Sequence, residues 1–126
     1  MAGDLILIVD DNAVNLKLMR VLMLGEGYEV RTAVNAEEAL TVLAEIAPRL
    51  ILMDLQMPGM DGLELTRRLK KDPALSRTVI VALTAYAMKG DEAKALEAGC
   101  DGYVTKPIDT RTLAATIARH LGSDGR

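Results

Sequence analysis

The amino-acid sequence predicts an α/β protein with a doubly wound, five-stranded parallel sheet in the strand order 2-1-3-4-5. Along all 126 residues, short apolar runs rich in β-branched residues alternate with longer segments whose apolar residues recur every three or four positions. The first pattern is typical of strands and the second of amphipathic helices. Three of the short runs are apolar almost throughout, as in strands covered by helices on both faces. Right-handed crossovers between such strands produce an open sheet with helices on each side.

The predicted elements alternate as strand and helix, five times over, with no long linker between them. The predicted strands are Leu5–Val9, Tyr28–Ala33, Leu50–Met53, Val79–Leu83 and Gly102–Thr105. The predicted helices are Ala13–Leu24, Ala36–Ala47, Leu63–Lys70, Asp91–Ala98 and Thr110–Leu121. A chain of this length fits one domain, residues 1–126, in which residues 122–126 form a short tail. We expect no attached output domain in this chain, which is either a stand-alone protein or part of a longer regulator or kinase.

Residues typical of helix ends stand between these segments. Asn35 precedes the second helix with Glu38 three residues further on, which resembles a capping box. Asp109 is placed to cap the fifth helix, and Pro48 cannot extend the second one. Three helices are followed by a glycine, the residue that most easily adopts the left-handed conformation of a C′ position: Gly25, Gly99 and Gly122.

The composition excludes several classes of protein. The chain carries 15 basic and 18 acidic residues, and its net charge of −3 is unlike that of a protein that binds nucleic acid directly. The single cysteine allows no disulfide within the chain and no cysteine-based zinc site. No apolar run approaches the roughly 20 residues that cross a membrane, and Met1–Asp4 lack the basic segment of a signal peptide. We therefore expect a cytoplasmic protein with no membrane contact.

Polar side chains stand at the carboxyl ends of four of the five predicted strands. Asp10 and Asp11 follow the first strand, Asp54 follows the third, Thr84 ends the fourth and Lys106 follows the fifth. Taken singly, each is an ordinary turn, cap or surface residue. Because the carboxyl ends of parallel strands meet at one edge of a sheet, all five converge there. Three carboxylates that close together need a cation or raised pKa values, and oxygen ligands with room for water suit Mg²⁺.

A hard cation beside Asp54, with Lys106 opposite, is an arrangement suited to phosphoryl transfer. A carboxylate can act as the nucleophile and become an aspartyl phosphate. The metal and the ammonium group then share the charge on the phosphoryl oxygens, and Thr84 donates a hydrogen bond to one of them.

These segments together resemble the receiver domain of bacterial two-component response regulators, over roughly residues 4–121. The matching stretches are residues 5–12 (LILIVDDN), 50–62 (LILMDLQMPGMDG), 82–85 (ALTA) and 103–107 (YVTKP). Residues 87–92 with Gly99 and Cys100 are similar to single-domain regulators of cell division, and receivers attached to hybrid histidine kinases share many of these features.

The resemblance implies a role for each residue of the cluster. Asp54 corresponds to the phosphoacceptor, which takes the phosphoryl group from a phosphohistidine of a histidine kinase or a histidine phosphotransfer protein. Asp11, Asp54 and the backbone carbonyl of Gln56 correspond to direct Mg²⁺ ligands. Asp10 corresponds to the acid that helps to hold the metal, often through water. Lys106 corresponds to the lysine that pairs with the phosphoryl group.

The resemblance also implies how phosphorylation is transmitted. Thr84 and Tyr103 correspond to a switch pair in which the hydroxyl turns inward and the ring follows. We expect phosphorylation to shift the loop Ala85–Gly90 and the surface of the fourth helix, fifth strand and fifth helix, where a downstream protein target binds. Ala85 corresponds to a small residue that allows access to the site, and the bond from Lys106 to Pro107 is cis in the family. The protein is then a monomer or a phosphorylation-dependent homodimer.

The first helix and the only histidine carry two further expectations. The first helix is apolar on more than one face, and the surplus, including Leu16, is a candidate patch for docking the histidine-bearing helices of a kinase. His120 stands at the predicted end of the last helix, where a cation is favoured, and we expect no catalytic role for it.

Three other functions share parts of this pattern. A haloacid-dehalogenase-like phosphohydrolase uses an aspartate nucleophile but needs a second acid two residues later, where this chain has Gln56. A flavodoxin-like carrier of a flavin needs a phosphate-binding loop and aromatic residues, and this chain has Asp10 and Asp11 in place of that loop. A docking module without phosphorylation would not need the full acidic set. We therefore expect no steady enzymatic turnover, only slow autodephosphorylation.

Overall fold

A computed structural model describes residues 3–55, 62–84, 91–106 and 108–124, and all their side chains except those of 91–92 and 122–124. Its five parallel strands form one sheet in the order β2-β1-β3-β4-β5, as predicted. The strands are β1 (Leu5–Val9), β2 (Glu29–Ala33), β3 (Leu50–Asp54), β4 (Val79–Thr84) and β5 (Gly102–Thr105). The helices are α1 (Ala13–Gly25), α2 (Ala36–Leu43), α3 (Gly62–Lys71), α4 (Asp91–Ala98) and α5 (Thr110–Asp124).

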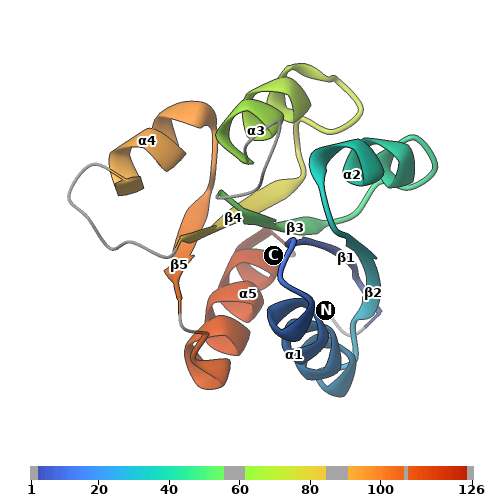
Figure 1. Ribbon diagram of the computed structural model, residues 1–126, viewed down its shortest axis with the longest axis vertical. Helices are drawn as coiled ribbons and strands as arrows, with labels where there is room; N and C mark the ends of the chain where they lie inside the picture. The colour runs from blue at the N-terminus through green and yellow to red at the C-terminus, as the bar shows by residue number, and fades with distance from the viewer. Residues whose placement is uncertain (1–2, 56–61, 85–90, 107, 125–126) are drawn as a thin grey trace.

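The sheet is the middle layer of three. Helices α1 and α5 cover one face, and α2, α3 and α4 cover the other (Figure 1). Successive side chains of β1 alternate between the two faces: Ile6 and Ile8 pack in the cluster below α1 and α5, and Leu7 and Val9 in the cluster below α2 and α3. Both clusters consist of buried apolar residues, which confirms that the central strands are covered on both faces.

Several strand boundaries differ from the prediction by one residue, each for a local hydrogen-bonding reason. Strand β2 begins after Tyr28, because the backbone N–H of Tyr28 donates to Met23 at the end of α1 instead. Strands β3 and β4 extend to Asp54 and Thr84, since Asp54 still pairs with β4 and Thr84 still accepts from Lys106. Asp54 and Thr84 are therefore both part of the hydrogen-bonded sheet.

Helix ends also differ from the prediction. Helices α1 and α3 are slightly longer, and α5 continues through Gly122 to Asp124, so Gly122 is no C′ residue. Helix α2 ends at Leu43 and not at Ala47, because Ala47 precedes Pro48, which disfavours the helical conformation and removes a donor.

The predicted caps are largely confirmed. Asn35 accepts a hydrogen bond from the Glu38 N–H at 2.7 Å, although Glu38 itself accepts from Val34 and not from Asn35. Asp109 accepts from two N–H groups in the first turn of α5. Gly99 has a φ of 114°, as predicted, but after α1 the residue with positive φ is Gly27, at 92°, because Gly25 is still helical.

Among the described residues, no helix combines the length and the apolar character that a membrane span requires.

Candidate functional site

The turn after β1 brings two carboxylates to the carboxyl edge of the sheet. The backbone N–H of Asp10 donates to Ala33, which continues the pairing with β2, and one carboxylate oxygen of Asp10 accepts from the N–H of Asn12 at 2.8 Å. Asn12 in turn caps α1 by accepting from the Asn15 N–H. Within this turn Asp10 is completely buried, and the next residue, Asp11, is exposed to solvent.

The end of β3 supplies the third carboxylate. Asp54 is the last residue of the strand and is 1% exposed. Its backbone lies directly against Gly62, the first residue of α3, where a Cβ atom would stand 2.8 Å from the Cα of Leu55. The close approach of α3 to β3 therefore requires glycine at position 62, and it fixes the backbone that carries the Asp54 carboxylate.

The three carboxylates converge as predicted. Asp10, Asp11 and Asp54 each offer an oxygen, and these oxygens lie within 4.8 Å of one another. At that separation, two unit charges in an effective dielectric of 20 repel each other by about 3.5 kcal/mol. The ammonium group of Lys106 offsets part of this repulsion, because its Nζ lies 3.4 Å from Asp10 Oδ2 and 3.3 Å from Asp54 Oδ2. Among the described residues, the cluster thus sets three carboxyl groups against one ammonium group.

The same cluster fits a hard divalent cation. Asp10 Oδ2 is buried and, within the described part of the chain, accepts no hydrogen bond. A buried carboxylate oxygen without a donor is costly unless a cation compensates for it, and Lys106 at 3.4 Å does so only partly. Asp11 faces solvent, which leaves room for the water ligands that Mg²⁺ retains. The expected carbonyl ligand, that of Gln56, lies outside the described residues.

Thr84 and Tyr103 lie on neighbouring strands and on the same face of the sheet. In the register of β4 and β5, Tyr103 is paired with Ala82, two residues before Thr84. Ala82 packs in the cluster on the α2–α4 face, so Thr84 and Tyr103 point to that face as well. Thr84 is buried, whereas Tyr103 is 39% exposed. The expected roles of Ala85, the loop 85–90 and Pro107 concern residues that the structure does not describe.

His120 differs from its expected role. Its ring packs against Gly102 of β5, where a Cβ atom would stand 2.6 Å from the ring nitrogen Nε2. Burial, together with the charge of Arg119, lowers the pKa of His120 below its usual 6.5, while Asp101 acts in the opposite direction. The lowered pKa disfavours the cationic form near pH 7, and α5 continues beyond His120 to Asp124, so the prediction of a cation at the helix end is wrong.

The structure thus brings four of the predicted residues into one cluster and places Thr84 at the same sheet edge. It also assigns a structural role to Gly62, which was part of the matching motif but had no role of its own in the sequence analysis. The signal for it was a glycine that opens an amphipathic helix, since glycine is otherwise a poor choice in a helix.

A five-stranded parallel sheet in this order, with an acid cluster and a lysine at its carboxyl edge, defines a class of signalling domain. The chain belongs to the response regulator receiver domain family, which matches residues 6–118. The family role is that of a phosphorylation switch in two-component signalling.

Individual relatives agree with this assignment. The polar-differentiation response regulator DivK of Brucella anthropi is 44% identical over 117 residues, which cover 93% of this chain and 95% of that protein. The signal receiver domain of a signal transduction histidine kinase from Syntrophus aciditrophicus is 33% identical, with a TM-score of 0.88 over 96% of this chain and 92% of that one. The chemotaxis response regulator CheY4 of Vibrio cholerae is 27% identical, with a TM-score of 0.89 over 94% of this chain and 98% of that one. The resemblance stated from the sequence is confirmed.

Proposed function

We propose that Asp54 accepts a phosphoryl group from a phosphohistidine of a histidine kinase or a histidine phosphotransfer protein. The observation that carries the proposal is the convergence of Asp10, Asp11 and Asp54 with Lys106. Asp10, Asp11 and Asp54 would hold Mg²⁺, which on binding shares the negative charge of the phosphoryl oxygens.

The Asp54 carboxylate is the only nucleophile that phosphoryl transfer from the phosphohistidine requires. An oxygen of the Asp54 carboxylate attacks phosphorus, a P–O bond forms and the P–N bond to the donor histidine breaks. The electron pair of the broken bond returns to the ring nitrogen, and the imidazole leaves neutral if its other nitrogen carries a proton. The Lys106 ammonium group, 3.3 Å from Asp54 Oδ2, is close enough to pair with the phosphoryl group once it is attached. Thr84, buried at the end of β4, supplies a hydroxyl donor at the same edge.

The phosphorylated state alters the surface formed by α4, β5 and α5, at the β5 side of the sheet. Phosphorylation adds nearly two negative charges to a buried site, so that Lys106 and Thr84 gain a strong acceptor. Movement of Thr84 changes the space beside Tyr103, whose ring is partly exposed on the neighbouring strand. The surface of α4, β5 and α5 then differs between the two states, and a downstream protein target binds one of them. Whether a dimer forms through this surface remains a prediction, as does the cytoplasmic location.

Slow autodephosphorylation belongs to the same proposal. Steady hydrolysis would need a general acid–base two residues after the nucleophile, and the side chain at that position is the neutral amide of Gln56. Residues 1–126 would act as one receiver unit, in which residues 122–124 continue α5 and are not part of a tail.

The exposed face of α1 is the surface that we assign to the phosphodonor. Val14, Leu18 and Val21 are exposed, Val14 by 76%, and they line one shallow apolar hollow on the helix. Helix α1 begins directly after the acidic turn, so a helical bundle on this face lies next to Asp54. Leu16, the residue expected from the sequence, packs partly against the core instead, because it lies on the inner side of the helix.

The test is phosphorylation by acetyl phosphate with and without Mg²⁺, comparing the wild type with Asp54→Asn. We expect the wild type to take up phosphate only with Mg²⁺ and the variant to take up none. Amide spectra recorded with the phosphoryl mimic beryllofluoride should change at Thr84 and Tyr103 in the wild type alone. Equal phosphate uptake by Asp54→Asn would contradict the assignment of the acceptor, and unchanged spectra would contradict the switch. Multiple turnovers of p-nitrophenyl phosphate would instead favour a hydrolase.

A further inference from the structure

A hollow between α2 and α3 lies at the opposite edge of the sheet from the acidic cluster. It has a volume of about 390 Å³ and is lined by Leu40 and Leu43 of α2 and by Ala44, the residue that follows that helix. The carboxyl ends of the parallel strands lie together at the end of the sheet that holds Asp54. Each helix then returns the chain to the other end of the sheet, where the strands begin. The last turns of α2 and α3 therefore lie far from the phosphorylation site. They also lie on the opposite face of the sheet from α1 and α5 (Figure 1).

The floor of the hollow is apolar, and its rim is cationic. Leu69 and Leu75, both buried, form part of the floor, while the exposed Arg68 and Lys71 stand at the rim together with Asp72.

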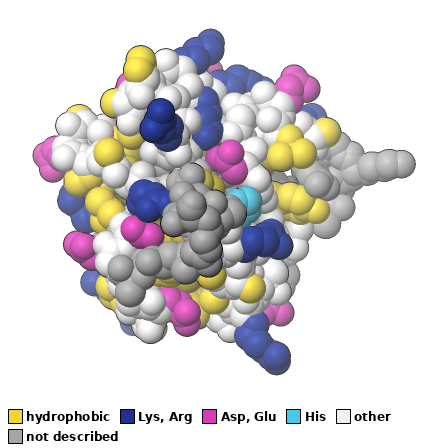
Figure 2. All heavy atoms as spheres, turned by 180° about the vertical axis from the view of Figure 1, so that it is seen from behind, with side chains coloured by type: hydrophobic (Ala, Val, Ile, Leu, Met, Phe, Trp, Pro, Cys, Tyr) yellow, Lys and Arg dark blue, Asp and Glu magenta, His cyan; other side chains and the backbone are white. Residues whose placement is uncertain are grey.

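The rim cations are available for a partner. Within the described residues, neither Arg68 nor Lys71 forms an ion pair, whereas their neighbour Lys70 is engaged by Asp101 at 3.1 Å and by the Thr78 carbonyl at 2.8 Å. Seen from behind in Figure 2, lysine and arginine side chains gather at the top of the molecule, where Figure 1 places α3. The acidic residues of α2 lie in its first turn, at the other end of that helix. Among the charged residues that line the hollow, Arg68 and Lys71 outnumber Asp72, so the lining carries one surplus positive charge although the chain as a whole is negative.

We propose that the hollow between α2 and α3 is a docking site for an acidic amphipathic helix of a protein partner. Leucine-like side chains of the partner would fill the apolar floor, and its carboxylates would pair with Arg68 and Lys71. The site does not include Asp54 or any of its neighbours. Docking is therefore independent of phosphorylation and leaves the phosphodonor face of α1 open, so that one partner can stay bound while the phosphorylation state changes.

The test uses a fluorescent synthetic peptide of about 15 residues, with leucines along one helical face and glutamates beside them. A matched peptide carries lysines in place of the glutamates. We expect the acidic peptide alone to bind, equally with and without beryllofluoride, and to shift the amide signals of Ala44 and Leu75. The double variant Arg68→Glu, Lys71→Glu should weaken binding at least about tenfold.

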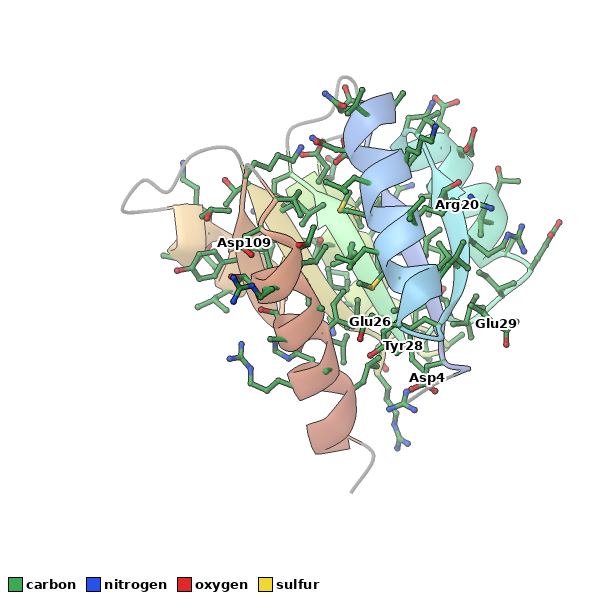
Figure 3. The ribbon with its side chains drawn as sticks, turned by 90° about the horizontal axis from the view of Figure 1, so that it is seen from below. Asp4, Arg20, Glu26, Tyr28, Glu29 and Asp109 are labelled. Carbon is green, nitrogen blue, oxygen red and sulfur yellow. The ribbon has the colours of Figure 1, made fainter. Side chains whose placement is uncertain are left out.

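Two further variants keep the test decisive. The double variant Arg20→Glu, Arg119→Glu changes the net charge by the same amount as Arg68→Glu, Lys71→Glu, but on α1 and α5. Arg20 lies on the β2 side of α1 (Figure 3). This control variant should leave peptide binding unchanged. Ala44→Asp places a carboxylate in the wall at an exposed position and should weaken binding without loss of folding. No binding of the acidic peptide, or equal binding of the basic one, would overturn the proposal.

Binding of anionic lipid or of a second copy of the chain in the hollow would give different experimental results. Sedimentation with phosphatidylglycerol vesicles that Arg68→Glu, Lys71→Glu abolishes would assign the surface to anionic lipid and overturn the proposal. Concentration-dependent self-association lost in the same variant would assign it to a second copy of the chain, with the same consequence. None of these outcomes depends on phosphate uptake by Asp54, so this proposal and the proposed function can fail separately.

Discussion

Replacement of Gly62 by alanine tests whether the contact between α3 and β3 supports the phosphorylation site. A Cβ atom at this position would overlap the carbonyl oxygen of Asp54 and lie 2.8 Å from the Cα of Leu55 and 3.0 Å from the carbonyl carbon of Asp54. All three neighbours are backbone atoms, which cannot turn aside as a flexible side chain can. Either α3 or the end of β3 must therefore move, and the end of β3 carries the Asp54 carboxylate.

The expected loss of free energy of unfolding in Gly62→Ala is the difference between two opposing effects. Overpacking of a buried site costs about 1–3 kcal/mol. Alanine in place of glycine gains up to about 1 kcal/mol within a helix, and less in the first turn, where Gly62 lies. We therefore expect Gly62→Ala to lower the free energy of unfolding by about 1–2 kcal/mol. With an m-value of about 2 kcal/mol per molar urea, the midpoint of unfolding falls by about 0.5–1 M.

Gly25→Ala is the matched control. Gly25 is also helical, has no positive φ, and has open space where a Cβ atom would stand. The same substitution should there raise the free energy of unfolding by about 0.5 kcal/mol, because it restricts the unfolded chain. Urea titration followed by circular dichroism measures both variants, and phosphate uptake from acetyl phosphate should fall in Gly62→Ala alone. If Gly62→Ala is as stable as Gly25→Ala, the close contact does not constrain the site.

Two other predictions concern the surface and the pH dependence of stability. Val14→Asp on α1 should slow phosphotransfer from a histidine kinase by about tenfold, as expected for loss of a central contact, while uptake from acetyl phosphate stays normal. Leu96→Asp, at an exposed leucine of α4, should leave both rates unchanged, and equal slowing by the two variants would remove the special role of α1. For His120, the pKa in the folded protein is lowered from 6.5, so the unfolded chain binds the extra proton first as the pH falls. The stability that neutral His120 contributes is therefore present above about pH 6.5 and is lost below it. In urea unfolding at about pH 7.5 and about pH 5.5, the wild type should lose more stability on acidification than His120→Gln, and equal losses would show that burial of the ring has no such effect.

The acid cluster could be predicted because it depends on chain order and on one rule of parallel sheets. Asp10 and Asp54 each follow an apolar strand, and the carboxyl ends of such strands meet whatever the side chains around them are. The different environments of Asp10 and Asp11 could not be predicted, since adjacent residues in a turn are buried or exposed according to what packs above them. The ring of His120 illustrates the same limit, because its neighbour Gly102 is 18 residues away in the sequence.

The sequence by itself determined the alternation of strands and helices, the parallel sheet and the edge at which Asp54, Thr84 and Lys106 meet. Hydrophobic periodicity and the ends of the elements are local properties, because they depend on residues that are close together in the sequence. Only the tertiary structure decided the contact of Gly62 with the end of β3 and the cationic hollow between α2 and α3. Both depend on how closely neighbouring elements approach each other, and these distances are set by the packing of buried side chains.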